Sequence, residues 1–357
     1  MNDEYRQLYQ ELQRRMSPGG ELSPGTRDTE ATFRRSGVWD LERLRMHRTI
    51  LDQFKERYGD RPRDGHAVLL TAGAPGAGKG GAQANLTALQ GRDTEIGREL
   101  ARAHGVNLDD YVVLDPDQFK VAIFRHGGLP QLDAQSRELP FGREVTPSEM
   151  ASLIHRESAF VQDEFERWAR GEGYNLLYDA TLKNEAKNTR LLTDLADQGY
   201  DKRVILSVEV PLEQCLQQNH TRWESGRKEF EQGRDDYGGR MAPEAMIKDL
   251  YQQSSTGRGY SIGRENAERL ADKGLVTGLI TSDRGTFTTQ APAPVGLLAQ
   301  APAFQQGDTT MRIAAAGRLR STTGTTGTTG TPVQPATRPA PQAPHTPHHQ
   351  PGPGRTR

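Results

Sequence analysis

The sequence contains little cysteine and little apolar material. Cys215 is the single cysteine in 357 residues, which excludes an internal disulfide framework and is typical of a reducing compartment. Hydrophobic residues make up 34% of the chain, too few to pack its whole length, so we expect a core built from part of it. No stretch approaches the ~18 consecutive apolar residues that a membrane-spanning helix needs. We therefore expect no membrane partner.

Net charge is also almost absent. Lys and Arg number 46 against 47 Asp and Glu, which gives a formal net charge of −1. This balance argues against a nucleic-acid coat and against a protein held on a membrane surface by charge. The first residues, MNDEYRQLYQ, are polar and acidic, unlike a signal peptide. We expect a cytoplasmic protein with no nucleic-acid partner.

Four short apolar runs predict β-strands at residues 66–73, 111–115, 174–181 and 202–210. Each run is continuous rather than alternating, as in strands that are covered on both faces. Amphipathic stretches of helical length separate the runs, and a fifth strand is expected near 276–281. The pattern predicts an α/β fold with a mostly parallel five-stranded sheet. A helix from about 39 to 58 would pack on this sheet through an apolar stripe of Leu41, Leu44, Ile50, Leu51 and Phe54.

The two ends of the chain differ from its middle. Residues 2–16 predict a charged helix, and the following SPGGELSPGTRD segment predicts a flexible linker by its Pro, Gly and Ser content. After residue 290 the chain is rich in Pro, Thr and Gly, a composition that cannot offset its ordering entropy by apolar burial. We therefore expect an N-terminal helix and linker at 1–34, a folded domain at 35–290 and a disordered tail at 291–357.

A glycine-rich segment with one lysine follows the first predicted strand. Its residues are Gly73, Ala74, Pro75, Gly76, Ala77, Gly78, Lys79, Gly80 and Gly81. The G-x-x-x-x-G-K spacing between a strand and a helix is that of a P-loop, whose backbone N–H groups surround a phosphate. Lys79 would reach the β- and γ-phosphates. The segment therefore predicts nucleotide binding.

Two features of this loop need weighing. Gly76, Gly78 and Gly81 also fit the dinucleotide pattern G-x-G-x-x-G, but that pattern needs an acidic residue about 20 residues further on. Asp115 lies much farther away, and Lys79 would have no role. The residue after the P-loop lysine, commonly a Ser or Thr that binds Mg²⁺, is Gly80 here. Mg²⁺ would then depend on the nucleotide, water and a carboxylate elsewhere.

Polar side chains follow the next strands. Asp115 and Asp117 come after the second predicted strand, and Asp179 and Thr181 follow the third. Because ligands bind at the carboxyl ends of parallel strands, one of these carboxylates could accept a hydroxyl proton while another supports a metal. Arg222 and Arg240 follow the fourth strand, and phosphoryl transfer needs arginines that close over the phosphates.

Taken in order, these segments resemble the zeta-toxin family of P-loop kinases, over about Ala67 to Gln290. The segments are GAPGAGKG, LDPDQF, EVTPSE, GYNLLYDATL, TRWE and GRMAPE. The resemblance implies a three-layer P-loop kinase fold, with Asp117 as the catalytic base and Lys79, Arg222 and Arg240 on the phosphates. It places Asp179 near the metal, directly or through water. Asp115, Asp117, Thr181 and Glu157 would lie on the substrate side.

The resemblance further implies ATP-dependent, Mg²⁺-dependent phosphorylation of UDP-N-acetylglucosamine on a sugar hydroxyl, which interferes with cell-wall precursor synthesis, and a small helical antitoxin as a partner. Three alternatives stay open. The acceptor could be another hydroxyl compound. The chain could be a nucleotide-binding regulator with weak turnover, because Gly80 replaces the hydroxyl residue. The helix at 2–16 could fold over the nucleotide site and inhibit it.

Overall fold

The computed structural model describes residues 3–25, 27–63, 66–89, 108–284 and 286–290. The predicted tail at 291–357 lies outside these residues. The α-helices are α1 (Asp3–Met16), α2 (Thr29–Phe33), α3 (Leu41–Tyr58), α4 (Lys79–Leu89), α6 (Pro116–Arg125), α7 (Ala134–Arg137), α8 (His155–Gly171), α9 (Glu185–Asp197), α10 (Leu212–Glu231), α11 (Glu244–Gln252) and α12 (Ile262–Asp272). Short 3-10 helices are η1 (Leu108–Asp110), η2 (Pro140–Gly142) and η3 (Pro147–Ile154).

The main sheet contains the five predicted parallel strands and one more. Its order is β10-β9-β8-β3-β7-β4, and its strands are β3 (Ala67–Ala72), β4 (Val112–Leu114), β7 (Leu176–Tyr178), β8 (Lys202–Glu209), β9 (Gly278–Asp283) and β10 (Thr286–Gln290). The edge strand β10 pairs antiparallel with β9, so the Thr-rich segment after Asp283 extends the sheet. Two small two-stranded sheets form apart from the main sheet. One pairs β1 (Arg34–Arg35) with β2 (Val38–Trp39), and the other pairs β5 (Glu138–Leu139) with β6 (Arg143–Glu144).

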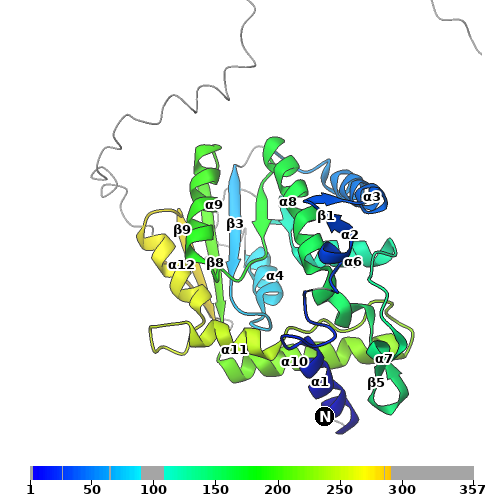
Figure 1. The fold of residues 1–357 in the computed structure, drawn as a ribbon. Helices are drawn as coiled ribbons and strands as arrows, with labels where there is room; N and C mark the ends of the chain where they lie inside the picture. The colour runs from blue at the N-terminus through cyan, green and yellow to red at the C-terminus, as the bar shows by residue number, and fades with distance from the viewer. Residues whose placement is uncertain (1–2, 26, 64–65, 90–107, 285, 291–357) are drawn as a thin grey trace, which may run out of the picture. The chain divides into compact units, whose positions relative to one another are not determined.

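Helices cover both faces of this sheet, which confirms the three-layer α/β prediction (Figure 1). Along β3, Val68 and Leu70 face one apolar cluster, to which α3, α6, α8, α9 and α12 contribute. Ala67 and Leu69 face a second cluster with α4, α10 and α11. Because successive strand residues point to opposite faces, a strand buried on both sides must be apolar throughout. None of the helices in the described ranges has the length and apolar character to cross a membrane.

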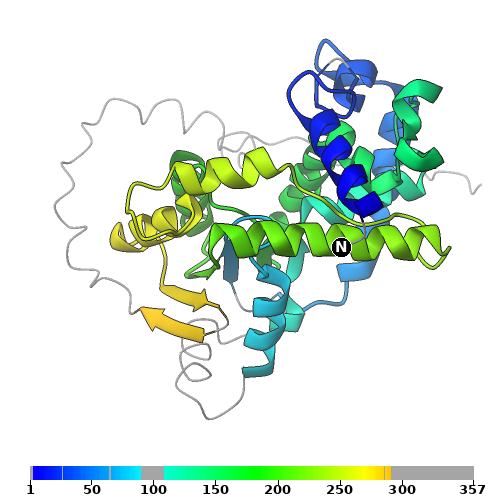
Figure 2. The same cartoon turned by 90° about the horizontal axis from the view of Figure 1, so that it is seen from below.

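The N-terminal segment packs on the domain, contrary to the predicted flexible linker. Leu8, Leu12 and Leu22 are fully buried in a third apolar cluster with Leu153 and Trp223. Both views place α1 against α10 (Figures 1 and 2). The linker is held because burial of Leu22 and a hydrogen bond from Ser152 Oγ to the Leu22 carbonyl offset its ordering entropy.

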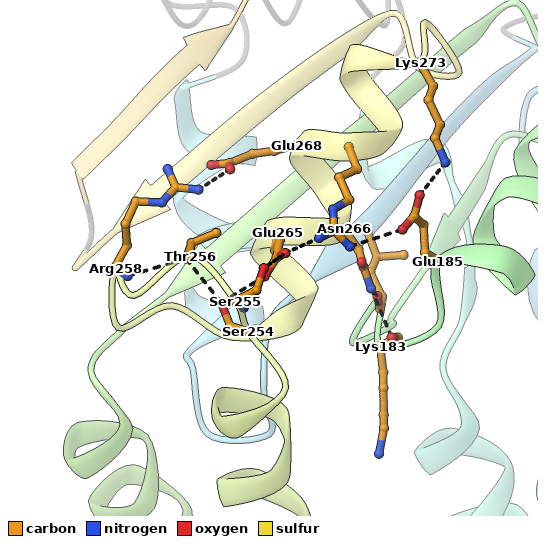
Figure 3. Close-up of polar contacts among 12 residues, drawn as sticks. Lys183, Glu185, Ser254, Ser255, Thr256, Arg258, Glu265, Asn266, Glu268 and Lys273 are labelled. Atoms are coloured by element: carbon orange, nitrogen blue, oxygen red, sulfur yellow. Dashed lines mark hydrogen bonds and ion pairs between the residues drawn. The ribbon is translucent and has the colours of Figure 1, made fainter.

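A buried carboxylate, Glu265, holds part of the loop that leads into α12, and Glu209 accepts hydrogen bonds from Ser261 at the loop's end. Glu265 is only 4% exposed and accepts hydrogen bonds from the Ser255 backbone N–H (2.8 Å), Ser255 Oγ (2.6 Å) and Ser254 Oγ (3.1 Å). Figure 3 shows these contacts together with the neighbouring Arg258–Glu268 pair. The loop thereby places the start of α12 beside the P-loop, where an added Cβ on Gly263 would lie 3.4 Å from the Gly73 nitrogen.

Candidate functional site

A cavity of about 840 Å³ opens at the carboxyl ends of β3, β4 and β7. It is the place where parallel α/β sheets bind ligands. The structure brings together there groups that lie far apart along the chain. Its wall includes the P-loop together with Asp115, Asp117, Lys120, His155, Asp179, Arg222 and Arg240.

The P-loop follows β3, and α4 begins at Lys79, as its spacing predicts. Gly73 has φ +140°, and a Cβ there would lie 2.4 Å from the Val208 carbonyl oxygen. Gly76 has φ +93°, and a Cβ would lie 2.5 Å from the Cys215 carbonyl oxygen. Only glycine meets both demands, because positive φ and close backbone approach exclude a side chain. The loop is therefore fixed in the shape that directs backbone N–H groups and the positive end of α4 at an anion.

Lys79 lies between the P-loop and the end of β7. Its Nζ donates to the Gly73 carbonyl at 3.0 Å and lies 3.7 Å from Asp179 Oδ1. The same Asp179 oxygen accepts a hydrogen bond of 2.9 Å from Thr71 Oγ1. The side chain of Lys79 is 13% exposed, so a phosphate entering the loop would meet a partly desolvated cation.

Asp117 lies on the first turn of α6, held between two cations. Lys120 Nζ donates to its Oδ1 at 2.9 Å, and Arg240 Nη1 donates to its Oδ2 at 3.2 Å. Burial on its own would raise the pKa of Asp117, but the charges of Lys120 and Arg240 outweigh burial and lower this pKa to about 2. Asp117 is therefore ionised at neutral pH.

Asp115 has the opposite environment. It is the N-cap of α6, and its side chain accepts a hydrogen bond from the Asp117 backbone N–H at 2.9 Å. Burial, followed by the negative charges of Asp117 and Asp179, raises its pKa to about 6. The two carboxyl groups of one short segment thus differ widely in proton affinity.

The predicted arginines come from α10 and from the loop that follows it. Arg222 donates from Nε to the Arg240 carbonyl at 3.3 Å and from Nη2 to Asn219 Oδ1 at 3.4 Å. Arg240 points to Asp117, with its side chain 47% exposed. Both arginines line the cavity that contains Lys79.

The cavity suits a polyphosphate better than a metal ion held by protein side chains alone. The shaped P-loop and Lys79 suit a polyphosphate. Within the described part of the chain, no group of three or more His, Cys, Asp or Glu is placed to hold a metal ion. Asp179 supplies carboxylate oxygens but Gly80 supplies no hydroxyl, so the residues fit an Mg²⁺ that keeps most of its waters and is carried by phosphates.

Two residues expected on the substrate side lie elsewhere. Glu157 does not line the cavity: it is fully buried and accepts hydrogen bonds of 2.6 Å from Arg43 and His47. Both oxygens of the Glu157 carboxylate are therefore occupied by this pairing. Helix α3 directs Arg43 and His47 into the domain, whereas Leu41 and Leu44, predicted to lie on its packed face, are exposed. Thr181 follows Asp179 but does not line the cavity. Its carbonyl oxygen faces the start of α12, where a Cβ added to Gly263 would lie only 2.3 Å from it.

Sequence reasoning missed Lys120, whose Nζ pairs with Asp117. The i, i+3 spacing of Asp117 and Lys120 at the start of a helix could have indicated this pair.

A smaller cavity of about 270 Å³ lies on the other side of the P-loop, between the ends of β8 and β9, with Gly78 and Gln218 common to both cavities. It offers room beside the P-loop that the sequence did not indicate.

The parallel sheet, the P-loop and the carboxylate–arginine cavity define a P-loop kinase-type phosphotransferase. The family model described as zeta toxin matches residues 51–257, more than half of the chain. The chain therefore belongs to the zeta toxin family. Comparison with curated proteins gave no match.

Solved structures similar to this chain include two toxin-related proteins. One belongs to the PezAT chromosomal toxin-antitoxin system of Streptococcus pneumoniae, with 14% identity, 69% of this chain and 79% of that chain covered, and a TM-score of 0.44. The other is the AvrRxo1-ORF1:AvrRxo1-ORF2 complex with sulphate ions, with 18% identity, 76% of each chain covered and a TM-score of 0.42.

Proposed function

We propose that this chain is an ATP-dependent kinase that phosphorylates a sugar hydroxyl of UDP-N-acetylglucosamine. One observation carries the proposal: an ionised carboxylate, Asp117, lies in the same cavity as the P-loop lysine and two arginines. Phosphoryl transfer needs a base for the attacking hydroxyl and cations on the transferring group. The choice of acceptor rests on membership of the zeta toxin family.

Asp117 would take the proton from the acceptor hydroxyl. With a pKa of about 2 it is a weak base while Lys120 and Arg240 hold it. Phosphates that draw Arg240 away would remove one of its two ion pairs and raise its pKa toward the value that proton transfer requires. Arg240 would thus link phosphate binding to activation of the base.

Lys79, Arg222 and Arg240 would neutralise the charge that develops on the transferring phosphoryl group. Mg²⁺, when bound with the nucleotide, supplies further charge neutralisation across the phosphates. The P-loop backbone from Gly73 to Gly81 would hold the phosphates, and Asp179 would orient the water around the metal. The smaller cavity beside β8 and β9 has room for part of the nucleoside.

The direct test is phosphate transfer by purified protein with ATP, with and without UDP-N-acetylglucosamine, followed by mass spectrometry of the sugar nucleotide. A product heavier by one phosphoryl group, absent with Lys79→Ala, supports the proposal. Lys79→Ala should reduce transfer by ~10³-fold or more because it removes the main phosphate cation. ATP binding without that product in a panel of sugar nucleotides contradicts the proposed acceptor.

A nucleotide-binding regulator with weak turnover is the second candidate. Gly80 and Gly81 favour it, since neither carries the hydroxyl that commonly binds Mg²⁺ in a P-loop. Tight ATP binding with no transfer, unchanged by Gly80→Ser, would identify this function. As a member of a toxin family, the chain is also proposed to bind a small helical antitoxin, which co-purification from its native host would test.

A further inference from the structure

We propose that helix α1 is a built-in brace for Arg240, and that Gln13 is the positioning residue which holds the arginine's loop. The inference rests on the proposed function, because it assigns a role to the loop of a phosphate-binding arginine. Residues 3–16 lie outside the region that the family model matches, 51–257. The proposed brace therefore lies in a segment outside the family-model match.

The loop is fixed before Arg240 by the first turn of η3. Ser148 donates from its backbone N–H to the Tyr237 carbonyl and from Oγ to the Gly239 carbonyl, both at 2.9 Å. Gly239 presses on α10 so closely that a Cβ would lie 2.0 Å from the Trp223 carbonyl oxygen. These contacts hold the backbone on this side of Arg240.

The loop is fixed after Arg240 by α10 and α1 together. Asn219 holds the Ala242 backbone from both sides, accepting from its N–H and donating to its carbonyl at 3.0 Å each. Gln13 Nε2 donates to the same carbonyl at 3.4 Å, and Gln13 Oε1 accepts from the Glu244 backbone N–H at 2.8 Å. Gln13 thus bridges the end of the arginine loop and the first residue of α11.

Helix α1 is itself anchored firmly enough to act as a brace. Tyr9 Oη accepts a hydrogen bond from Asn219 at 3.2 Å, and Leu8 and Leu12 are fully buried. Arg15 donates to the Ser136 carbonyl at 2.8 Å. Figures 1 and 2 both show α1 against α10, with its axis at a steep angle to that of α10.

The same helix forms part of the cavity wall rather than a plug. Met16, its last residue, and Pro24 line the cavity, which keeps about 840 Å³ and still includes the P-loop. Arg240 is 47% exposed, and its guanidinium donates to Asp117 at 3.2 Å. The position of the Arg240 side chain therefore depends on the backbone that Ser148, Asn219 and Gln13 hold. Helix α1 thus supports the site. An inhibitory segment would instead occupy the cavity.

A double-mutant cycle tests the brace. Gln13→Met removes both hydrogen bonds while keeping side-chain length and helix propensity, and Gln10→Ala on the exposed face of α1 is the control. We expect Gln13→Met to lower kcat about 10-fold with unchanged ATP affinity, and to have no further effect in an Arg240→Ala background. Additive effects, or a kcat equal to or above that of the wild type, would overturn the proposal.

Limited trypsin digestion gives a readout that does not need activity. Trypsin cleaves after arginine, and we expect Gln13→Met to release the fragment that begins at Met241 several-fold faster than wild type and Gln10→Ala. Equal rates in all three proteins would overturn the brace. If wild type transfers phosphate to no acceptor, the proposed function fails while this digestion still decides whether Gln13 holds the loop.

Discussion

In the proposed reaction, Asp117 faces two opposing demands, since a base must be ionised and yet basic enough to take a proton. The ion pairs with Lys120 and Arg240 keep Asp117 ionised, but they also make it a weaker base. Asp117→Asn keeps the shape and removes the basic oxygen. We expect ATP affinity to stay within about twofold and kcat to fall by at least ~10², the usual contribution of a general base. Isothermal titration and single-turnover transfer measure the two effects.

If Asp117→Asn turned over as fast as wild type, another residue would have to be the base. Asp115, whose pKa of about 6 lies nearer to neutral pH, would then be the first residue to replace.

Gly80 is the residue at which this P-loop departs from the usual sequence, and the structure leaves room for the missing side chain. A Cβ on Gly80 would meet no heavy atom within 4 Å. Gly80→Ser should therefore fold normally, add a hydroxyl for Mg²⁺ and lower the Mg²⁺ concentration that gives half-maximal turnover several-fold. Gly80→Ala is the matched control, with a Cβ but no hydroxyl. An identical Mg²⁺ dependence in both variants would show that the hydroxyl does not limit metal binding.

Asp115 should make stability depend on pH. Its pKa rises from 3.8 to about 6 on folding, so the folded protein binds this proton more tightly than the unfolded chain does. The free energy of unfolding contributed by this group therefore falls as pH rises from about 4 to 6. Asp115→Asn, which keeps the helix cap, should stabilise the protein by on the order of 1–2 kcal/mol at pH 7.5 and by almost nothing near pH 4.

Urea unfolding of both proteins at the two pH values measures this difference. A variant that is less stable than wild type at pH 7.5 would show that the hydrogen bond of the ionised Asp115 outweighs the unfavourable effect of its burial.

At the scale of elements, Glu265 holds the first part of the loop before α12, while Glu209 holds its end at Ser261. Glu265→Ala would leave Ser254, Ser255 and the Ser255 backbone N–H without their acceptor. We expect a loss of about 2 kcal/mol in the free energy of unfolding, because three partly buried hydrogen bonds to a charged acceptor are lost, and faster proteolysis between residues 253 and 261. Glu268→Ala is the control, since it breaks more exposed ion pairs with Arg258 and Arg264 and should cost less than about 1 kcal/mol. Equal effects of the two substitutions would contradict this assignment.

Elements that local sequence defines were predicted well. The strands and the P-loop follow from continuous apolar runs and from glycines whose backbone conformation no other residue adopts. The pairing of Glu157 with Arg43 and His47 was not predictable, because it joins residues 114 and 110 positions apart. Composition likewise indicated a linker around Leu22, and only the distant Leu153 and Trp223 explain why it is packed. In both cases the structure is set by contact partners that lie far away in the sequence.

At the scale of the whole molecule, the N-terminal segment and the kinase domain share one apolar cluster. Leu8, Leu12 and Leu22 reach zero exposure only through contact with the cluster that includes Leu153 and Trp223. Trp223 is next to Arg222 on α10, and Gln13 of α1 donates to the Ala242 carbonyl two residues after Arg240, so α1 contacts the elements that carry both arginines. Folding of the N-terminal segment and integrity of the site should therefore be coupled.

Deletion of residues 1–25 tests this coupling. Burial of each leucine contributes about 1.5–3 kcal/mol, so the truncated protein should lose on the order of 5 kcal/mol and unfold at a lower temperature, with lower turnover. Deletion of 291–357, whose composition offers no core, should leave both properties unchanged. Calorimetry and transfer assays on the two truncations measure the contrast. A higher turnover after removal of residues 1–25, at unchanged stability, would instead show that α1 restrains the enzyme in cis, because a segment that only inhibits can leave without weakening the core.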